Sequence, residues 1–79
     1  MKQQEIIEIV KTKGNIGCTN IEHYIDMPDK INGDYVQVVF FDDERGLAVY
    51  LVDEYDQGEF VDYEDYSHKE EIENYLLEL

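Results

Sequence analysis

The sequence is short of basic residues, contains one cysteine and contains no tryptophan. A lone cysteine cannot form an internal disulfide, which excludes the class of small disulfide-rich domains. No apolar run approaches the ~20 residues that a membrane-spanning helix needs. The first residues also do not lead into the apolar core of a signal peptide. Together these absences predict a cytoplasmic protein.

The patterns that usually carry catalysis are also missing. There is no glycine-rich phosphate loop, no cysteine or histidine cluster with zinc spacing, and no Gly-x-Ser-x-Gly segment. Cys18 and His23 are five residues apart, without a loop that would form an oxyanion hole. Twenty acidic residues allow many carboxylate pairs by chance, so no single pair indicates acid–base chemistry. We therefore predict no enzyme, no cofactor and no metal site.

A calcium loop is not predicted in the acidic region either. Asp53, Gly58 and Glu64 stand at the first, sixth and twelfth places of such a loop. The third and fifth places hold Tyr55 and Gln57, where an aspartate or asparagine is needed. The match is most simply explained by chance in a stretch rich in aspartate.

The basic residues are scarcest in the second half of the chain. Fifteen of the twenty acids follow Gly33, but only two of the six basic residues do. Residues 34–79 therefore carry a formal charge of −13, and residues 1–33 carry −1. Such a surface attracts cationic partners and repels nucleic acid, lipid headgroups and acidic metabolites. The predicted partner is a basic protein, with no direct binding to nucleic acid or membrane.

What is present indicates one folded domain spanning residues 1–79, because 43% of the residues are hydrophobic and seven are tyrosines. Apolar residues at helical spacing predict a helix over residues 2–13 that Gly14 ends. A capping-box spacing from Thr19 to Glu22 predicts a short helix over residues 20–26, with a strand as the competing interpretation.

Three strands are predicted in the centre of the chain. Residues 35–41 and 47–52 are rich in β-branched and aromatic side chains, and Gly46 provides the positive φ for the hairpin between them. Residues 59–66 alternate between apolar and acidic side chains, as an edge strand does. A capping box from Ser67 to Glu70 predicts a final helix.

These elements predict an α+β fold. Its order is an N-terminal helix, a short second helix, a three-stranded antiparallel β-meander and a C-terminal helix, with the helices packed on one face of the sheet.

The candidate partner-binding site is the acidic region 42–65, which contains ten carboxylates and one basic residue, Arg45. Same-face carboxylates along a strand lie about 6.6 Å apart, close to the spacing of phosphates on a nucleic-acid strand. The simpler alternative is a solvated acidic edge that resists aggregation. Tyr55 is a candidate aromatic anchor. The candidate residues are Asp42, Asp43, Glu44, Asp53, Glu54, Tyr55, Asp56, Glu59, Asp62, Glu64 and Asp65.

The functional hypothesis is an inhibitor that mimics nucleic acid and blocks the basic site of a nuclease or defence complex in a bacterial host cell. Phage counter-defence proteins, of the anti-restriction and anti-CRISPR kinds, are similar in size and charge, although no motif links this chain to them. The alternative is an immunity protein or antitoxin that neutralises one cognate basic toxin. The same attraction between opposite charges would serve both.

Overall fold

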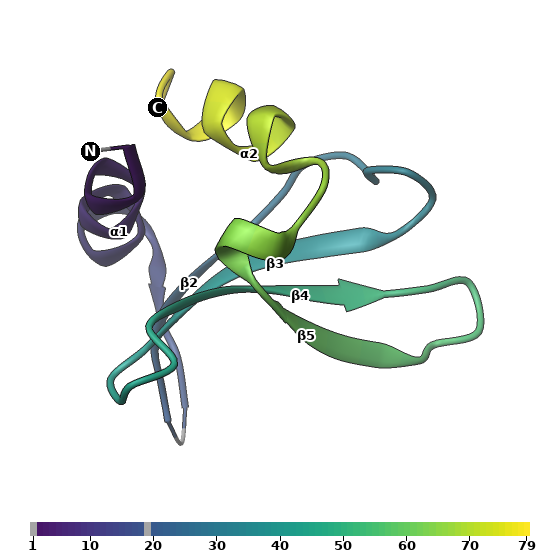
Figure 1. Ribbon diagram of the computed structural model, residues 1–79, viewed down its shortest axis with the longest axis horizontal. Helices are drawn as coiled ribbons and strands as arrows, with labels where there is room; N and C mark the ends of the chain where they lie inside the picture. Colours follow the sequence, from purple (N-terminus) through teal and green to yellow (C-terminus); the bar gives the residue numbers. More distant parts are fainter. Residues whose placement is uncertain (1, 19) are drawn as a thin grey trace.

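The computed structural model describes residues 2–18 and 20–79, which form two α-helices, one short 3₁₀-helix and five strands (Figure 1). The elements are α1 (Lys2–Lys13), β1 (Asn15–Ile16), β2 (Ile21–Asp26), β3 (Tyr35–Phe41), β4 (Leu47–Val52), β5 (Gly58–Asp62), the 3₁₀-helix η1 (Tyr63–Asp65) and α2 (Lys69–Leu76). The strands form one antiparallel sheet in the order β1-β2-β3-β4-β5. Within the described residues, neither helix is long and apolar enough to cross a membrane.

The predicted three-stranded meander is wrong, because the sheet has five strands. Residues 21–26, predicted as a short helix, form β2 and pair with β3, with Ile25 opposite Val38 and Tyr24 opposite Val39. The reason lies in β3, which is apolar on both faces. As the first strand of a meander it would have presented an unpaired apolar edge to water, and β2 covers that edge.

The predicted C-terminal helix is present as α2, but the chain between β5 and α2 departs from the prediction. The strand ends at Asp62, and residues 63–65 form η1, whose first turn is capped by the Asp62 side chain accepting a 3.0 Å hydrogen bond from the Glu64 amide. The predicted capping box from Ser67 is absent from this part of the structure. The N-cap of α2 is His68, which makes no side-chain capping bond.

The helix at the N-terminus, the strands 35–41 and 47–52, and the Gly46 turn are confirmed. Gly46 has φ 64°, and its carbonyl accepts a 2.8 Å hydrogen bond from the amide of Phe41. Gly14, just after α1, is required for a different reason. A Cβ there would collide with the carbonyl oxygens of Val10 and Tyr24, so glycine lets the chain turn tightly from the helix into the sheet.

The main core lies between one face of the sheet and both helices (Figure 1). The helices contribute Ile6 and Val10 from α1 and Ile72 and Leu76 from α2, all nearly inaccessible to water. The strands contribute every second residue, as a pleated sheet requires. The strand residues buried in this core are Ile25, Val36, Val38, Leu47 and Val49.

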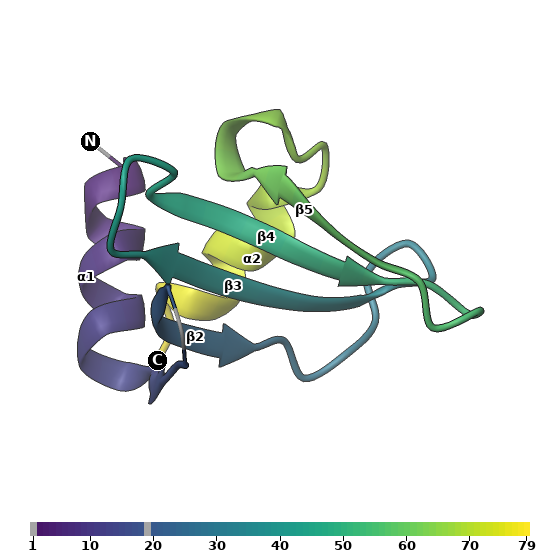
Figure 2. The same cartoon turned by 90° about the horizontal axis from the view of Figure 1, so that it is seen from below.

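The second face of the sheet, called here the open face, carries no helix in the described structure and lies toward the viewer in Figure 2. Partly buried side chains on this face pack around the buried ones and shield them from water. Val39, Phe41 and Ala48 are buried there, with Ile21, Tyr24 and Tyr50 packed around them. By strand pairing, the open face consists of Ile21, Tyr24, Asp26, Tyr35, Gln37, Val39, Phe41, Ala48, Tyr50, Val52, Gly58, Phe60 and Asp62.

Candidate protein-binding surface

The antiparallel topology distributes the predicted binding residues over three places. The β3–β4 loop and the β4–β5 loop lie at opposite ends of the sheet, and β5 with η1 forms an edge between them (Figure 1). The first loop carries Asp42, Asp43 and Glu44; the second carries Asp53, Glu54, Tyr55 and Asp56; the edge carries Glu59, Asp62, Glu64 and Asp65. The sequence cluster is therefore distributed over three elements of the fold, with Glu59 of the edge lining the same depression as Asp53 of the second loop.

The expected row of evenly spaced carboxylates along the third strand is not formed. Within β5, Glu59 pairs with Leu51, whose side chain contacts the helix-side core, whereas Asp62 pairs with Ala48 on the open face. These two acids thus belong to opposite faces of the sheet. Glu64 lies beyond the strand in η1. The spacing argument for phosphate mimicry was wrong because the strand ends at Asp62.

In the β3–β4 loop, Asp43 and Arg45 form a bidentate ion pair. The Arg45 Nε and Nη2 atoms donate to the two Asp43 carboxylate oxygens, with the shortest distance 2.7 Å. The hydrogen bonds from Arg45 lower the pKa of the Asp43 carboxyl below its usual value. The same guanidinium lies 3.8 Å from the centre of the Phe41 ring on the open face. Arg45 therefore joins an acidic loop to an aromatic surface.

At the edge of the sheet, Lys69 Nζ donates a 2.8 Å hydrogen bond to Glu64 Oε1. This bond raises the pKa of Lys69. Arg45 and Lys69 are the two basic residues that follow Gly33, so each is already paired with a carboxylate from the same half of the chain. Residues 34–79 hold no further lysine or arginine that could neutralise the other eight candidate carboxylates.

The β4–β5 loop is shaped by Asp53. Its Oδ1 atom accepts hydrogen bonds from the amides of Tyr55, at 2.8 Å, and Gln57, at 2.9 Å. One carboxylate thus serves the fold as well as the surface charge. Tyr55 is 75% exposed at the tip, as a residue available to a partner would be.

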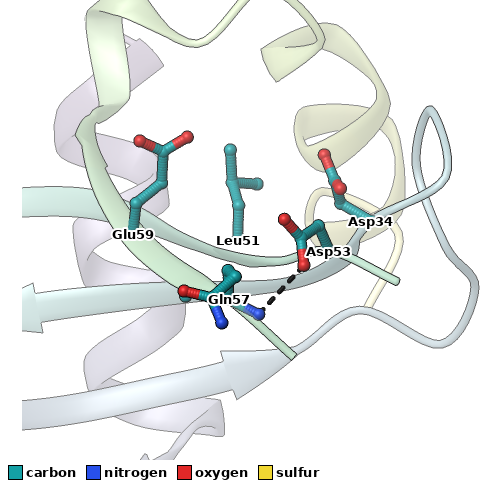
Figure 3. A pocket seen from close by; sticks show the side chains of 6 residues that line it. Asp34, Leu51, Asp53, Gln57 and Glu59 are labelled. Carbon is teal, nitrogen blue, oxygen red and sulfur yellow. Dashed lines mark hydrogen bonds between the residues drawn. The ribbon is translucent and has the colours of Figure 1, made fainter. Parts of the chain in front are cut away.

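Beside this loop lies an open depression of about 320 Å³, and three of its six lining residues are acidic. Figure 3 shows Glu59 on one side of Leu51, with Asp34 and Asp53 on the other. Within residues 2–18 and 20–79, no group of three or more histidine, cysteine, aspartate or glutamate side chains is arranged to hold a metal ion. The depression therefore adds negative charge to this end of the sheet but shows no coordination geometry.

The sequence interpretation missed the open face. Tyr50 and Phe60 lie there with ring centres 4.6 Å apart, and Phe60 remains 50% exposed. A second depression, of about 210 Å³, lies on this face beside Phe60 and Asp62. The pattern in the sequence did not single out these residues, because an aspartate follows two residues after each of the three phenylalanines, Phe40, Phe41 and Phe60. Its meaning depended on knowing which strands are neighbours.

No protein-family model, no curated protein and no solved structure matches this chain.

Proposed function

We propose that this protein is a non-catalytic inhibitor that binds the basic, nucleic-acid-binding surface of another protein. One observation carries the proposal: both basic residues of the second half are paired with its own acids, so eight candidate carboxylates there lack a lysine or arginine from residues 34–79. Holding like charges together costs self-repulsion, and binding a cationic surface relieves it. The class of partner remains that inferred from the charge distribution, namely a nuclease or another protein that handles nucleic acid.

The mode of binding follows from the three groups of carboxylates. Lysine and arginine side chains that normally contact phosphates would form ion pairs with the two loops and with the β5–η1 edge. Such contacts do not require the regular spacing of a nucleic-acid strand. They require only that the basic groups of the partner lie at matching places, and long-range attraction would speed the encounter.

The alternative function is neutralisation of one cognate basic toxin by an immunity protein or antitoxin. The spread of the acids over two loops and one edge, together with the aromatic open face, favours it, because such a surface complements one particular partner shape better than many. The two functions differ in the effect on nucleic acid. A general inhibitor displaces nucleic acid from its target, whereas an immunity protein silences a toxin whether or not that toxin binds nucleic acid.

The test begins with capture of partners from a lysate of the native cell at low salt, followed by elution with high salt. The purified partner is then mixed with a fluorescent oligonucleotide, and displacement by this protein is measured. We expect the partner to lose the oligonucleotide and the complex to weaken steeply as salt rises. A partner that binds both at full affinity would refute the inhibitor function.

Two variants that each lose four charges locate the surface. One neutralises exposed loop acids at both ends of the sheet: Asp42→Asn, Glu44→Gln, Glu54→Gln and Asp56→Asn. The other neutralises exposed acids elsewhere: Glu5→Gln, Glu8→Gln, Glu70→Gln and Glu78→Gln. We expect the loop variant to lose about tenfold or more in affinity and the control variant about threefold or less. Equal losses would mean that net charge alone acts, without a defined surface.

A further inference from the structure

Two segments at one end of the sheet place on the open face a phenylalanine that is followed two residues later by an aspartate. The first is Phe41 with Asp43, at the end of β3; the second is Phe60 with Asp62, at the end of β5. The third such pair in the sequence, Phe40 and Asp42, has its ring against the helix-side core. The strands β3 and β5 run in the same direction on either side of β4. The two rings meet on the open face, with centres 5.3 Å apart in an edge-to-face arrangement.

The two aspartates also have the same local geometry. Asp43 Oδ1 accepts a 2.9 Å hydrogen bond from the amide of Arg45, and Asp62 Oδ1 accepts a 3.0 Å hydrogen bond from the amide of Glu64. In both cases the donor is two residues further along the chain. Each carboxylate is thereby held by the same kind of turn.

The first of these pairs holds a guanidinium group that belongs to the protein itself. Arg45 lies 3.8 Å from the centre of the Phe41 ring and donates to both oxygens of Asp43. The planar guanidinium group can stack on the aromatic ring and at the same time donate two hydrogen bonds to the carboxylate. The structure thus contains an internal example of how this surface binds arginine.

The second pair offers the same groups without an arginine from this chain. The residue at the place of Arg45 is Glu64, whose carboxylate turns toward Lys69. Phe60 is 50% exposed, and Asp62 is exposed. The depression of about 210 Å³ on the open face lies next to both side chains, and it is also lined by Phe41, Arg45, Ala48 and Val61. The charge of Arg45 in this depression is balanced by Asp43.

We propose that Phe60 and Asp62 form a binding site for an arginine side chain of the basic protein partner, equivalent to the site that Phe41 and Asp43 form for Arg45. The inference rests on the proposed function, and it names the side chain that the open face recognises. The negative charge of the protein favours a positively charged side chain of a basic partner as the occupant. A second copy of the chain would bring a net charge of −14 against an equal charge, which opposes pairing through this face.

The experiment is an NMR titration of the ¹⁵N-labelled protein with the blocked peptide acetyl-Gly-Arg-Gly-amide in about 0.15 M salt, which screens non-specific attraction. The matching peptide with lysine is the second probe. We expect the arginine peptide to shift the amide signals of Phe60, Asp62 and Ala48, and to bind at least about threefold more tightly than the lysine peptide, because lysine cannot stack and donate in the same planar way.

Two substitutions test the two groups of the site, each with a matched control. Asp62→Asn removes one charge but keeps an oxygen for the turn, and its control is Glu70→Gln, an exposed acid in α2 outside the candidate binding residues. Phe60→Leu keeps apolar bulk but removes the ring, and its control is Tyr35→Leu, an aromatic residue that is 63% exposed at the start of β3. We expect each site variant to raise the Kd about threefold or more and each control to change it less than about 1.5-fold.

Equal binding of the two peptides, or equal effects of Asp62→Asn and Glu70→Gln, would overturn the arginine site. So would shifts confined to the two acidic loops. Spectra of the site variants that match the wild type away from β5 ensure that a lost response reports binding rather than unfolding. The variant with four neutralised loop acids, which tests the inhibitor function, keeps Phe60 and Asp62. Failure of the arginine site and failure of the inhibitor function are therefore seen in separate measurements.

Discussion

The Tyr63 hydroxyl donates a 2.9 Å hydrogen bond to the Glu73 carboxylate within the interface between η1 and α2. Tyr63 is 1% exposed and Glu73 is 8% exposed, so both are shielded from water. A buried carboxylate is costly unless hydrogen bonds compensate the lost hydration. The bond therefore ties the end of the acidic edge to the last helix, and it holds η1 where Asp62 caps it.

Replacing Tyr63 with phenylalanine should destabilise the fold. The substitution keeps the ring in the core but removes a hydrogen bond to a buried carboxylate, which is worth about 1–3 kcal/mol. Urea unfolding followed by circular dichroism measures the free energy of unfolding. Tyr35→Phe is the control, because Tyr35 is 63% exposed. Equal midpoints for the two variants would contradict a stabilising role of the Tyr63–Glu73 bond.

Alkaline pH should destabilise the protein, and Tyr63 should account for part of the effect. Burial, followed by the hydrogen bond to Glu73, raises the pKa of Tyr63 in the folded state above the ordinary value. A tyrosine in the unfolded chain loses its proton near pH 10, while the folded state keeps Tyr63 protonated. The contribution of Tyr63 to stability is thus fully present below about pH 10 and is lost as pH rises further.

The measurement is the free energy of unfolding between pH 8 and about pH 11, in the wild type and in Tyr63→Phe. The fall should be shallower in the variant, which has no phenol to ionise at this position. Lys69, whose folded pKa is also raised, contributes a fall of the same sign in both proteins. Parallel curves would show that Tyr63 ionises equally easily in both states.

The sequence predicted the elements whose pattern is local. The helix over residues 2–13 and the strands over 35–41 and 47–52 have the predicted bounds, because amphipathic spacing or β-branched runs determine them without help from distant residues. Residues 20–26 were predicted as a short helix, with a strand as the competing interpretation, because Ile21, Tyr24 and Ile25 fit a helical face as well as a strand; the strand is observed, over Ile21–Asp26. Pairing with β3, which is a tertiary effect, decides between the two.

The candidate site was predictable in composition but not in arrangement. Counting charges identified the acidic half and showed that Arg45 and Lys69 are its only basic residues. Counting did not show that each would pair with a neighbouring carboxylate, or that β5 would end at Asp62 and break the expected row. Counting charges also could not predict the contact between Phe41 and Phe60, because that contact depends on the order of the strands in the sheet.

Added salt should raise the melting temperature of the free protein. The molecule measures 30 × 28 × 21 Å, and at about 0.01 M salt the screening length is about 30 Å, so all its acidic groups repel one another. At about 0.5 M salt only near neighbours still do. We expect a rise of several degrees by differential scanning fluorimetry in sodium chloride, with a smaller rise in the variant that lacks the four loop acids. Identical responses would mean that the loop carboxylates do not repel one another appreciably.

The contact between Arg45 and Asp43, rather than the general field of the protein, should control the ionisation of Asp43. Hydrogen bonds from Arg45 lower the folded-state pKa of Asp43, so its contribution to stability is present above the unfolded value and is lost as pH falls. Arg45→Gln and Lys69→Gln each remove one positive charge from the same half of the chain, but only Arg45 touches Asp43. Titration of the Asp43 side-chain carboxyl carbon by NMR should show the pKa returning toward its ordinary value in Arg45→Gln and remaining low in Lys69→Gln. A similar rise in both variants would assign the effect to net charge, and it would remove the internal example on which the arginine site of Phe60 and Asp62 is based.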